Sequence, residues 1–125
     1  MVENETSYII RGAILKVYKR LGPGLFENVY KHILKYELEK AGMEVMMEVT
    51  SPVIYDCMNF DIGTWIDLPV DNKVIVELHS IERISEAHHK QVITYLRLSG
   101  KKLGILVNFD TQNITENIFR KVNHL

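Results

Sequence analysis

The fold is decided by one stretch of the chain, WIDLPVDNKVIVELH at residues 65–79. The apolar run at residues 73–78 predicts a central β-strand, and the turn-forming residues before it predict a hairpin with the preceding strand. Side chains two positions apart on a strand share a face, so Glu77 and His79 should project together, away from the core-facing Leu78. A polar pair on an otherwise apolar strand indicates a functional site.

The length of the hairpin loop decides whether Asp67 joins this pair. With a three-residue loop at 71–73, Val70 pairs with Val74 and Asp67 falls opposite Glu77. With a two-residue loop the register slips by one and Asp67 turns to the other face. Two-residue loops favour glycine at their second position, and this loop contains no glycine, so the longer loop is expected.

Two carboxylates that face each other across a strand pair repel, and a divalent cation relieves that repulsion. Asp67 and Glu77 are therefore candidate metal ligands. Each acid also has an ordinary interpretation by itself, Asp67 as a surface acid at a strand end and Glu77 as a charge that protects a sheet edge.

Composition narrows the functional classes. The 125 residues are 46% hydrophobic and 25% charged, which predicts one globular domain spanning 1–125. No apolar run approaches the ~20 residues of a membrane-spanning helix, and the start of the chain lacks the pattern of a secretory signal, so we expect a cytoplasmic protein without a membrane partner. The single cysteine, Cys57, fits a reducing compartment. A net charge of −1 argues against a strongly basic, sequence-indifferent nucleic-acid binder without excluding nucleic acid.

Hydrophobic spacing predicts an α/β fold of the mixed-sheet (α+β) kind, in the order helix, helix, three strands, helix, strand, helix. Asp56-Cys57-Met58-Asn59 is expected to be a turn between the first two strands. The predicted helices cover about residues 6–20, 25–41, 86–98 and 113–122, and the predicted strands about 45–55, 60–66, 73–78 and 103–109. The first of these strands is either long or broken, because Pro52 marks a bend or a sheet edge.

Several motifs in this order resemble the GxxExxY protein family, a group in the PD-(D/E)XK nuclease superfamily. The motifs are GLFENVY at 24–30, WID at 65–67, VIVELH at 74–79, His88 with Gln91 and Tyr95-Leu96, and GILVNF at 104–109. The resemblance spans nearly the whole chain. It implies a restriction-endonuclease-like core and a metal-dependent nuclease that acts on DNA or RNA.

The resemblance also implies roles for individual residues. Glu27, Asp67 and Glu77 would form an acidic site for Mg²⁺ or Mn²⁺. Gln91 and Tyr95, four apart on one helix face, resemble the QxxxY element of the RecB-like branch, which contacts nucleic acid. The ordinary alternatives are that Glu27 is a first-turn acid favoured by the helix dipole, that Tyr95 is a core residue and that Gln91 is a surface residue.

His79 departs from the family pattern, which has lysine at this position. Histidine could act as a weaker electrostatic partner or base, become an additional metal ligand, or mark a loss of catalysis. Lys90 on the following helix is the first candidate for a replacement charge, and His79→Lys should create or raise cleavage. We therefore expect a metal-dependent nuclease-like domain. The alternatives are an inactive nuclease fold that binds nucleic acid or protein, and a structural domain of an oligomer such as a homodimer.

Overall fold

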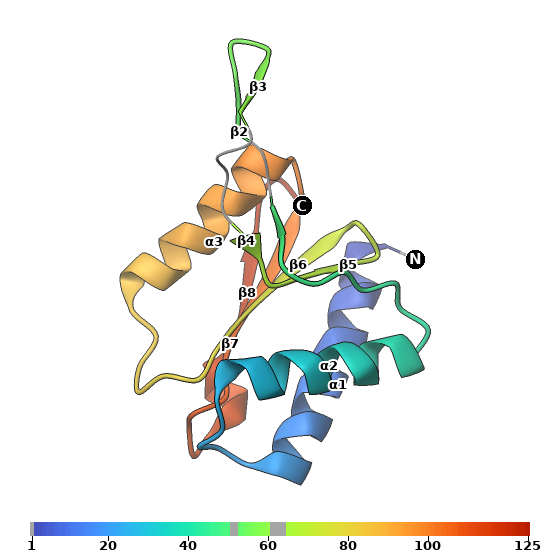
Figure 1. The fold of residues 1–125 in the computed structure, drawn as a ribbon, viewed down its shortest axis with the longest axis vertical. Helices are drawn as coiled ribbons and strands as arrows, with labels where there is room; N and C mark the ends of the chain where they lie inside the picture. Colours follow the sequence, from blue (N-terminus) through green and yellow to red (C-terminus); the bar gives the residue numbers. More distant parts are fainter. Residues whose placement is uncertain (1, 51–52, 61–64) are drawn as a thin grey trace.

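The computed structural model describes residues 2–50, 53–60 and 65–125. Its centre is a mixed four-stranded sheet in the order β5-β6-β7-β8 (Figure 1). The predicted α/β class with a mixed sheet is confirmed. The elements are α1 (Glu3–Leu21), α2 (Glu27–Lys40), β1 (Val49–Thr50), β2 (Val53–Tyr55), β3 (Met58–Phe60), β4 (Trp65–Ile66), β5 (Leu68–Val70), β6 (Val74–His79), α3 (Glu86–Ser99), β7 (Leu103–Asn108), η1 (Ile114–Asn117) and β8 (Ile118–Val122).

The helices cover both faces of the sheet (Figure 1). α1 and α2 pack with Val74, Val76 and Leu78 in the larger core. α3 packs on the other face with Ile75 and Leu106 in the smaller core. Because side chains alternate along β6, Glu77 and His79 belong to the α3 face.

The hairpin register is the one that the sequence predicts. Val70 pairs with Val74 and Leu68 pairs with Val76, so the loop is the three residues 71–73. Its first two residues have positive φ angles of 51° and 52°, a conformation that Asp and Asn tolerate better than most residues. The same register places Asp67, at the bend between β4 and β5, level with Glu77.

The first turn of α2 is fixed to the rest of the domain by Tyr30. Its ring is fully buried and stacks on Phe109 with centroids 4.4 Å apart. Its hydroxyl donates to the Gly22 carbonyl at 2.5 Å and accepts from the Leu25 amide at 3.2 Å. The tyrosine of the GLFENVY motif therefore fixes the loop that leads into Glu27.

The predicted C-terminal helix at 113–122 is wrong. The segment forms the short 3₁₀ helix η1 and then β8, which pairs antiparallel with β7. Its apolar residues at 114, 118 and 122 have helical spacing, but the open edge of β7 offers backbone hydrogen bonds to residues 118–122. Pairing at that edge outweighs local propensity.

In the region of the first two predicted strands, the first is broken, one of the two forms expected, and consists of the short strands β1 and β2. The predicted turn at 56–59 is narrower than expected because Met58 and Asn59 already belong to β3. Asp56 and Cys57 form the turn of this β2–β3 hairpin with positive φ angles of 52° and 60°. Part of the predicted strand at 60–66 lies at residues 61–64, outside the described residues.

No helix within the described ranges has both the length and the apolar character needed to cross a membrane.

Candidate active site

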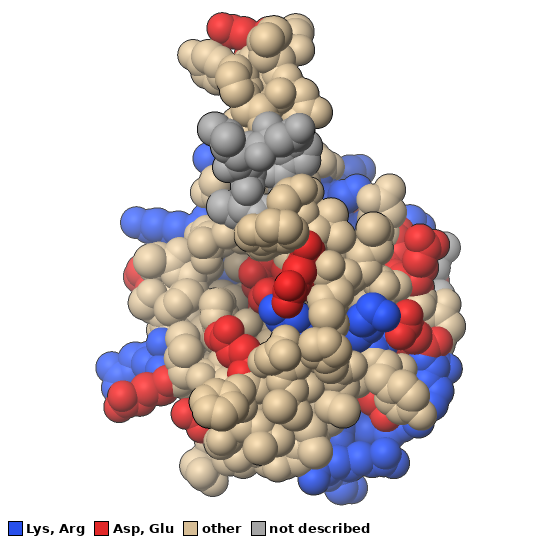
Figure 2. All heavy atoms as spheres, viewed as in Figure 1, with Lys and Arg blue, Asp and Glu red and all other residues tan. Residues whose placement is uncertain are grey.

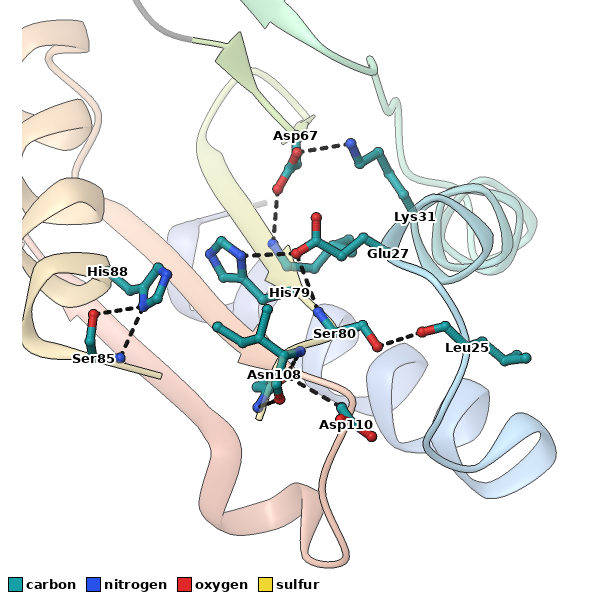
Figure 3. Close-up of polar contacts among 12 residues, drawn as sticks. Leu25, Glu27, Lys31, Asp67, His79, Ser80, Ser85, His88, Asn108 and Asp110 are labelled. Atoms are coloured by element: carbon teal, nitrogen blue, oxygen red, sulfur yellow. Dashed lines mark hydrogen bonds and ion pairs between the residues drawn. The ribbon is translucent and has the colours of Figure 1, made fainter. Parts of the chain in front are cut away.

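The candidate site lies at the end of β6, between α2 and α3 (Figure 3). The hairpin contributes Asp67 and Glu77, and the end of β6 contributes His79. The first two turns of α2 contribute Glu27 and Lys31, which are four residues apart and so share a helix face. The sequence predicts four of these five residues.

Asp67 and Glu77 are tied together through the backbone. The Asp67 amide donates to Glu77 Oε1 at 3.1 Å, and the Leu78 amide donates to Asp67 Oδ2 at 3.0 Å. Glu77 is only 6% exposed. Burial and then the charge of Asp67 raise the pKa of Glu77 to about 9. At neutral pH and with no added cation, Glu77 therefore holds a proton.

Lys31 is the cation closest to this pair. Its Nζ lies 3.0 Å from Asp67 Oδ1 and 3.2 Å from Glu48 Oε1, and its side chain is 11% exposed. Burial acts to lower the pKa of Lys31, but the hydrogen bonds and charges of Asp67 and Glu48 outweigh burial and raise it above 10.5. Lys31 is thus a charged, well-held ammonium group (Figure 3).

Sequence reasoning missed Lys31 and pointed to Lys90 instead. Lys90 is exposed on α3, on a surface that it shares with Glu86 and Arg97. The spacing between Glu27 and Lys31 was the available signal, because residues four apart in a helix lie on the same side.

Glu27 contacts His79 rather than the Asp67–Glu77 pair. Glu27 Oε1 lies 3.1 Å from His79 Nδ1 and accepts from the Ser80 amide at 3.3 Å. An ionised carboxylate can only accept, so His79 carries a proton on Nδ1 and its Nε2 is the ring nitrogen left for other partners. Ser80 Oγ also donates to the Leu25 carbonyl at 2.5 Å, which joins the start of α2 to the end of β6.

His88, on α3, lies beside His79 at the candidate site. Its ring centroid lies 4.7 Å from that of His79 (Figure 3). The Ser85 amide donates to His88 Nδ1 at 2.9 Å, so His88 carries its proton on Nε2. Because His88 also closes the capping box at the start of α3, its orientation is set by the helix itself.

Asn108 holds the loop that follows β6. Its side chain is 1% exposed, donates from Nδ2 to the Ile81 carbonyl at 2.9 Å and accepts from the Ile81 amide at 3.0 Å. The asparagine of the GILVNF motif is therefore a structural support for the strand end that carries His79.

Gln91 and Tyr95 differ in their environments. Tyr95 is 6% exposed and belongs to the core between α3 and the sheet. Gln91 is exposed on the same helix. The described contacts of the acidic residues do not include Gln91, so the structure leaves its expected role in substrate binding open.

The donor set fits a divalent cation in part. Asp67 and Glu77 offer oxygen ligands in adjacent positions, and burial together with the charge of Asp67 raises the pKa of Glu77, which a bound cation would offset. Within the described ranges, however, no three His, Cys, Asp or Glu side chains gather closely enough to hold an ion. The structure therefore does not place Glu27 around one point with Asp67 and Glu77, contrary to the prediction from the sequence.

The fold and the acidic pair define the class of the protein as a restriction-endonuclease-like domain. In a comparison with known families, residues 4–121 match the family described as the PD-(D/E)XK nuclease superfamily. This match covers almost the whole chain, and the chain belongs to that superfamily. Comparisons with curated proteins and with solved structures gave no match.

Proposed function

We propose that this chain is a metal-dependent nuclease-like domain of the GxxExxY group, with the RecB-like QxxxY element on α3, and that it hydrolyses nucleic-acid phosphodiesters in the cytoplasm. The observation that carries the proposal is the Asp67–Glu77 pair, in which two carboxylates meet and one is forced to keep its proton. Membership in the nuclease superfamily supports it independently.

Asp67 and Glu77 would hold Mg²⁺ or Mn²⁺, with Glu27 as the third acid. Both described contacts of Glu27 use Oε1, so Oε2 is the oxygen that we assign to the ion. Such an ion, when bound, supplies charge that stabilises the attacked phosphate and lowers the pKa of an attacking water. The charge of such an ion would favour the ionised form of Glu77, since it would offset both the burial of the carboxyl group and the repulsion from Asp67.

His79 would act through Nε2. Glu27 fixes the ring by accepting from Nδ1, in the way that carboxylates orient catalytic histidines. Nε2 can then accept a proton from water or, once protonated, donate to a phosphate oxygen. This arrangement favours a base or electrostatic role for His79 over a loss of function.

Nucleic acid would lie along α3, where Gln91 is exposed and Tyr95 anchors the helix in the core. The face of the molecule in Figure 2 carries acidic and basic groups side by side. A surface of mixed charge favours recognition of a particular structure or strand end over binding to any nucleic acid by charge alone.

An inactive nuclease fold that binds nucleic acid or protein is the second candidate. Two observations favour it, the histidine in place of the family lysine and the absence of a three-ligand cluster among the described residues.

Cation binding separates the two candidates. We expect Mn²⁺ titrated into the wild-type protein to bind at one site and to release about one proton near pH 7.5, since Glu77 must ionise. Asp67→Asn should weaken this binding at least about tenfold, because a charged ligand is lost. Asp71→Asn, in the hairpin loop, is the matched control. Absence of binding to the wild type would favour the binding-module candidate.

A further inference from the structure

The strand position that carries lysine in the family cannot supply a permanent charge here. His79 is shorter than lysine, and its Nδ1 is already directed at Glu27. The Asp67 carboxylate, beside the buried Glu77, still requires a cation to balance it. The question is which residue of this chain provides it.

Lys31 has the required geometry. Its ammonium group contacts Asp67 Oδ1, while the other oxygen of the same carboxylate, Oδ2, accepts a hydrogen bond from the Leu78 amide. Glu48 holds the same ammonium group from a second side, at 3.2 Å. A lysine ammonium has three N–H donors, and these two acceptors use two of them.

We propose that Lys31 on α2 takes over the role of the strand lysine, as the positioning residue that orients Asp67 and places a permanent positive charge beside the reacting phosphate. The inference rests on the proposed function, because it concerns the same site. Helix α2 would then contribute both an acid, Glu27, and the cation one turn later, while the strand keeps only its acid.

Other lysines near the site do not match this arrangement. Lys35, one turn further along α2, pairs with Glu39 on its own helix at 3.0 Å. Lys90 lies on the exposed side of α3. Of these three lysines, only Lys31 contacts an acid of the hairpin.

The test compares the wild type with Lys31→Met, His79→Lys, the double variant Lys31→Met/His79→Lys, and Lys35→Met as control. Mn²⁺ affinity is measured by calorimetric titration, and cleavage of single- and double-stranded substrates is measured in the same buffer. Methionine keeps most of the length and apolar stem of lysine and removes its charge. Thermal unfolding establishes that each variant is folded.

Two opposite changes are expected in Lys31→Met. Mn²⁺ should bind about tenfold more tightly, because a positive charge beside the ion is removed. Cleavage should fall by about 10²–10³, the usual loss for one preorganised electrostatic partner. In the His79→Lys background, Lys31→Met should cost at least about tenfold less in cleavage than it does in the wild type, because the lysine at 79 supplies the missing charge, which a merely structural role of Lys31 would not allow.

The single variant His79→Lys tests the inference with Lys31 in place, even if Lys31→Met does not fold. Because the site already has its cation, we expect no gain in cleavage from the new lysine, and a fall in cleavage because the imidazole of His79 is lost. A gain of about a hundredfold would overturn the inference and leave the nuclease function standing. Unchanged Mn²⁺ affinity in a folded Lys31→Met would also overturn it.

Failure of the proposed function gives a different result. If the wild type cleaves none of the substrates, tighter Mn²⁺ binding by Lys31→Met still supports Lys31 as the cation that balances Asp67. Equal binding or equal lack of binding by wild type and Lys31→Met overturns that role.

Discussion

Asp67 and Glu77 lie level with each other across the β5–β6 hairpin, and the backbone amide of Asp67 donates to Glu77 Oε1 at 3.1 Å. This bond keeps the buried Glu77 carboxylate beside Asp67. Burial and then the charge of Asp67 raise the pKa of Glu77 to about 9, and a cation bound there would offset both effects.

The first prediction concerns the pH dependence of stability. The folded state keeps the Glu77 proton, whereas the unfolded chain releases it above about 4.5. The contribution of Glu77 to stability is therefore complete below that pH and is lost as pH rises toward about 9. Glu77→Gln, which stays neutral, should exceed the wild type in free energy of unfolding by about 3–5 kcal/mol at alkaline pH, the usual cost of an uncompensated buried charge.

Urea unfolding of the two proteins between about pH 5 and pH 8.5 measures this difference. Added Mn²⁺ should stabilise the wild type at the alkaline end and leave Glu77→Gln unchanged. A difference in free energy of unfolding that stays constant across the pH range would show that the pKa of Glu77 is the same in the folded and unfolded states.

The second prediction concerns the packing of α3 against β7. A Cβ added to Gly104 of β7 would lie 2.8 Å from Val92 Cγ1, so Gly104→Ala should push the helix outward at a cost of about 1–3 kcal/mol. Gly12→Ala is the matched control. Its added Cβ meets no atom within 4 Å, and it should stabilise α1 by about 0.5–1 kcal/mol. Similar melting temperatures for the two variants would contradict the close packing of α3 on β7.

The third prediction concerns Gln91 and Tyr95. Gln91→Ala should weaken nucleic-acid binding without a measurable loss of stability, because the side chain is exposed. Tyr95→Ala should lose about 3–5 kcal/mol of stability, since the ring is buried in the core between α3 and the sheet. Binding is measured by fluorescence anisotropy with a labelled oligonucleotide. If Gln91→Ala binds the oligonucleotide with wild-type affinity, α3 has only a structural role.

The fourth prediction concerns the contact between Glu27 and His79. Glu27→Gln can still accept from the Ser80 amide but no longer offers a carboxylate to His79 Nδ1. We expect kcat to fall by about 10²–10⁴, the usual contribution of a general acid or base, because the ring of His79 is no longer held in place. Glu39→Gln, further along α2, is the control. An unchanged kcat in folded Glu27→Gln would show that the contact with Glu27 does not support a role of His79 in proton transfer.

The sequence predicts the hairpin and its acids well because local chemistry determines them. A loop without glycine favours the three-residue form, and that form fixes the register that places Asp67 level with Glu77. Strand alternation then sends Glu77 and His79 to the same face.

The remaining features depend on partners distant in sequence. β8 forms because β7 has an open edge, which the spacing of its own apolar residues does not reveal. Lys31 meets Asp67 only after α2 packs beside the hairpin, so reasoning along the chain pointed to Lys90 instead. The contact of Glu27 with His79 depends on the same packing.

The most direct test of the central claim is Mg²⁺- and Mn²⁺-dependent cleavage of single- and double-stranded DNA and RNA by purified wild-type protein, beside Asp67→Asn and the surface control Asp71→Asn. The account predicts cleavage by the wild type and by Asp71→Asn, abolished by chelation of the metal, and a loss of at least about 10³ in Asp67→Asn, because removal of a metal ligand disables the whole catalytic unit. Equal cleavage by Asp67→Asn and the wild type, or none by the wild type with either metal, would contradict it.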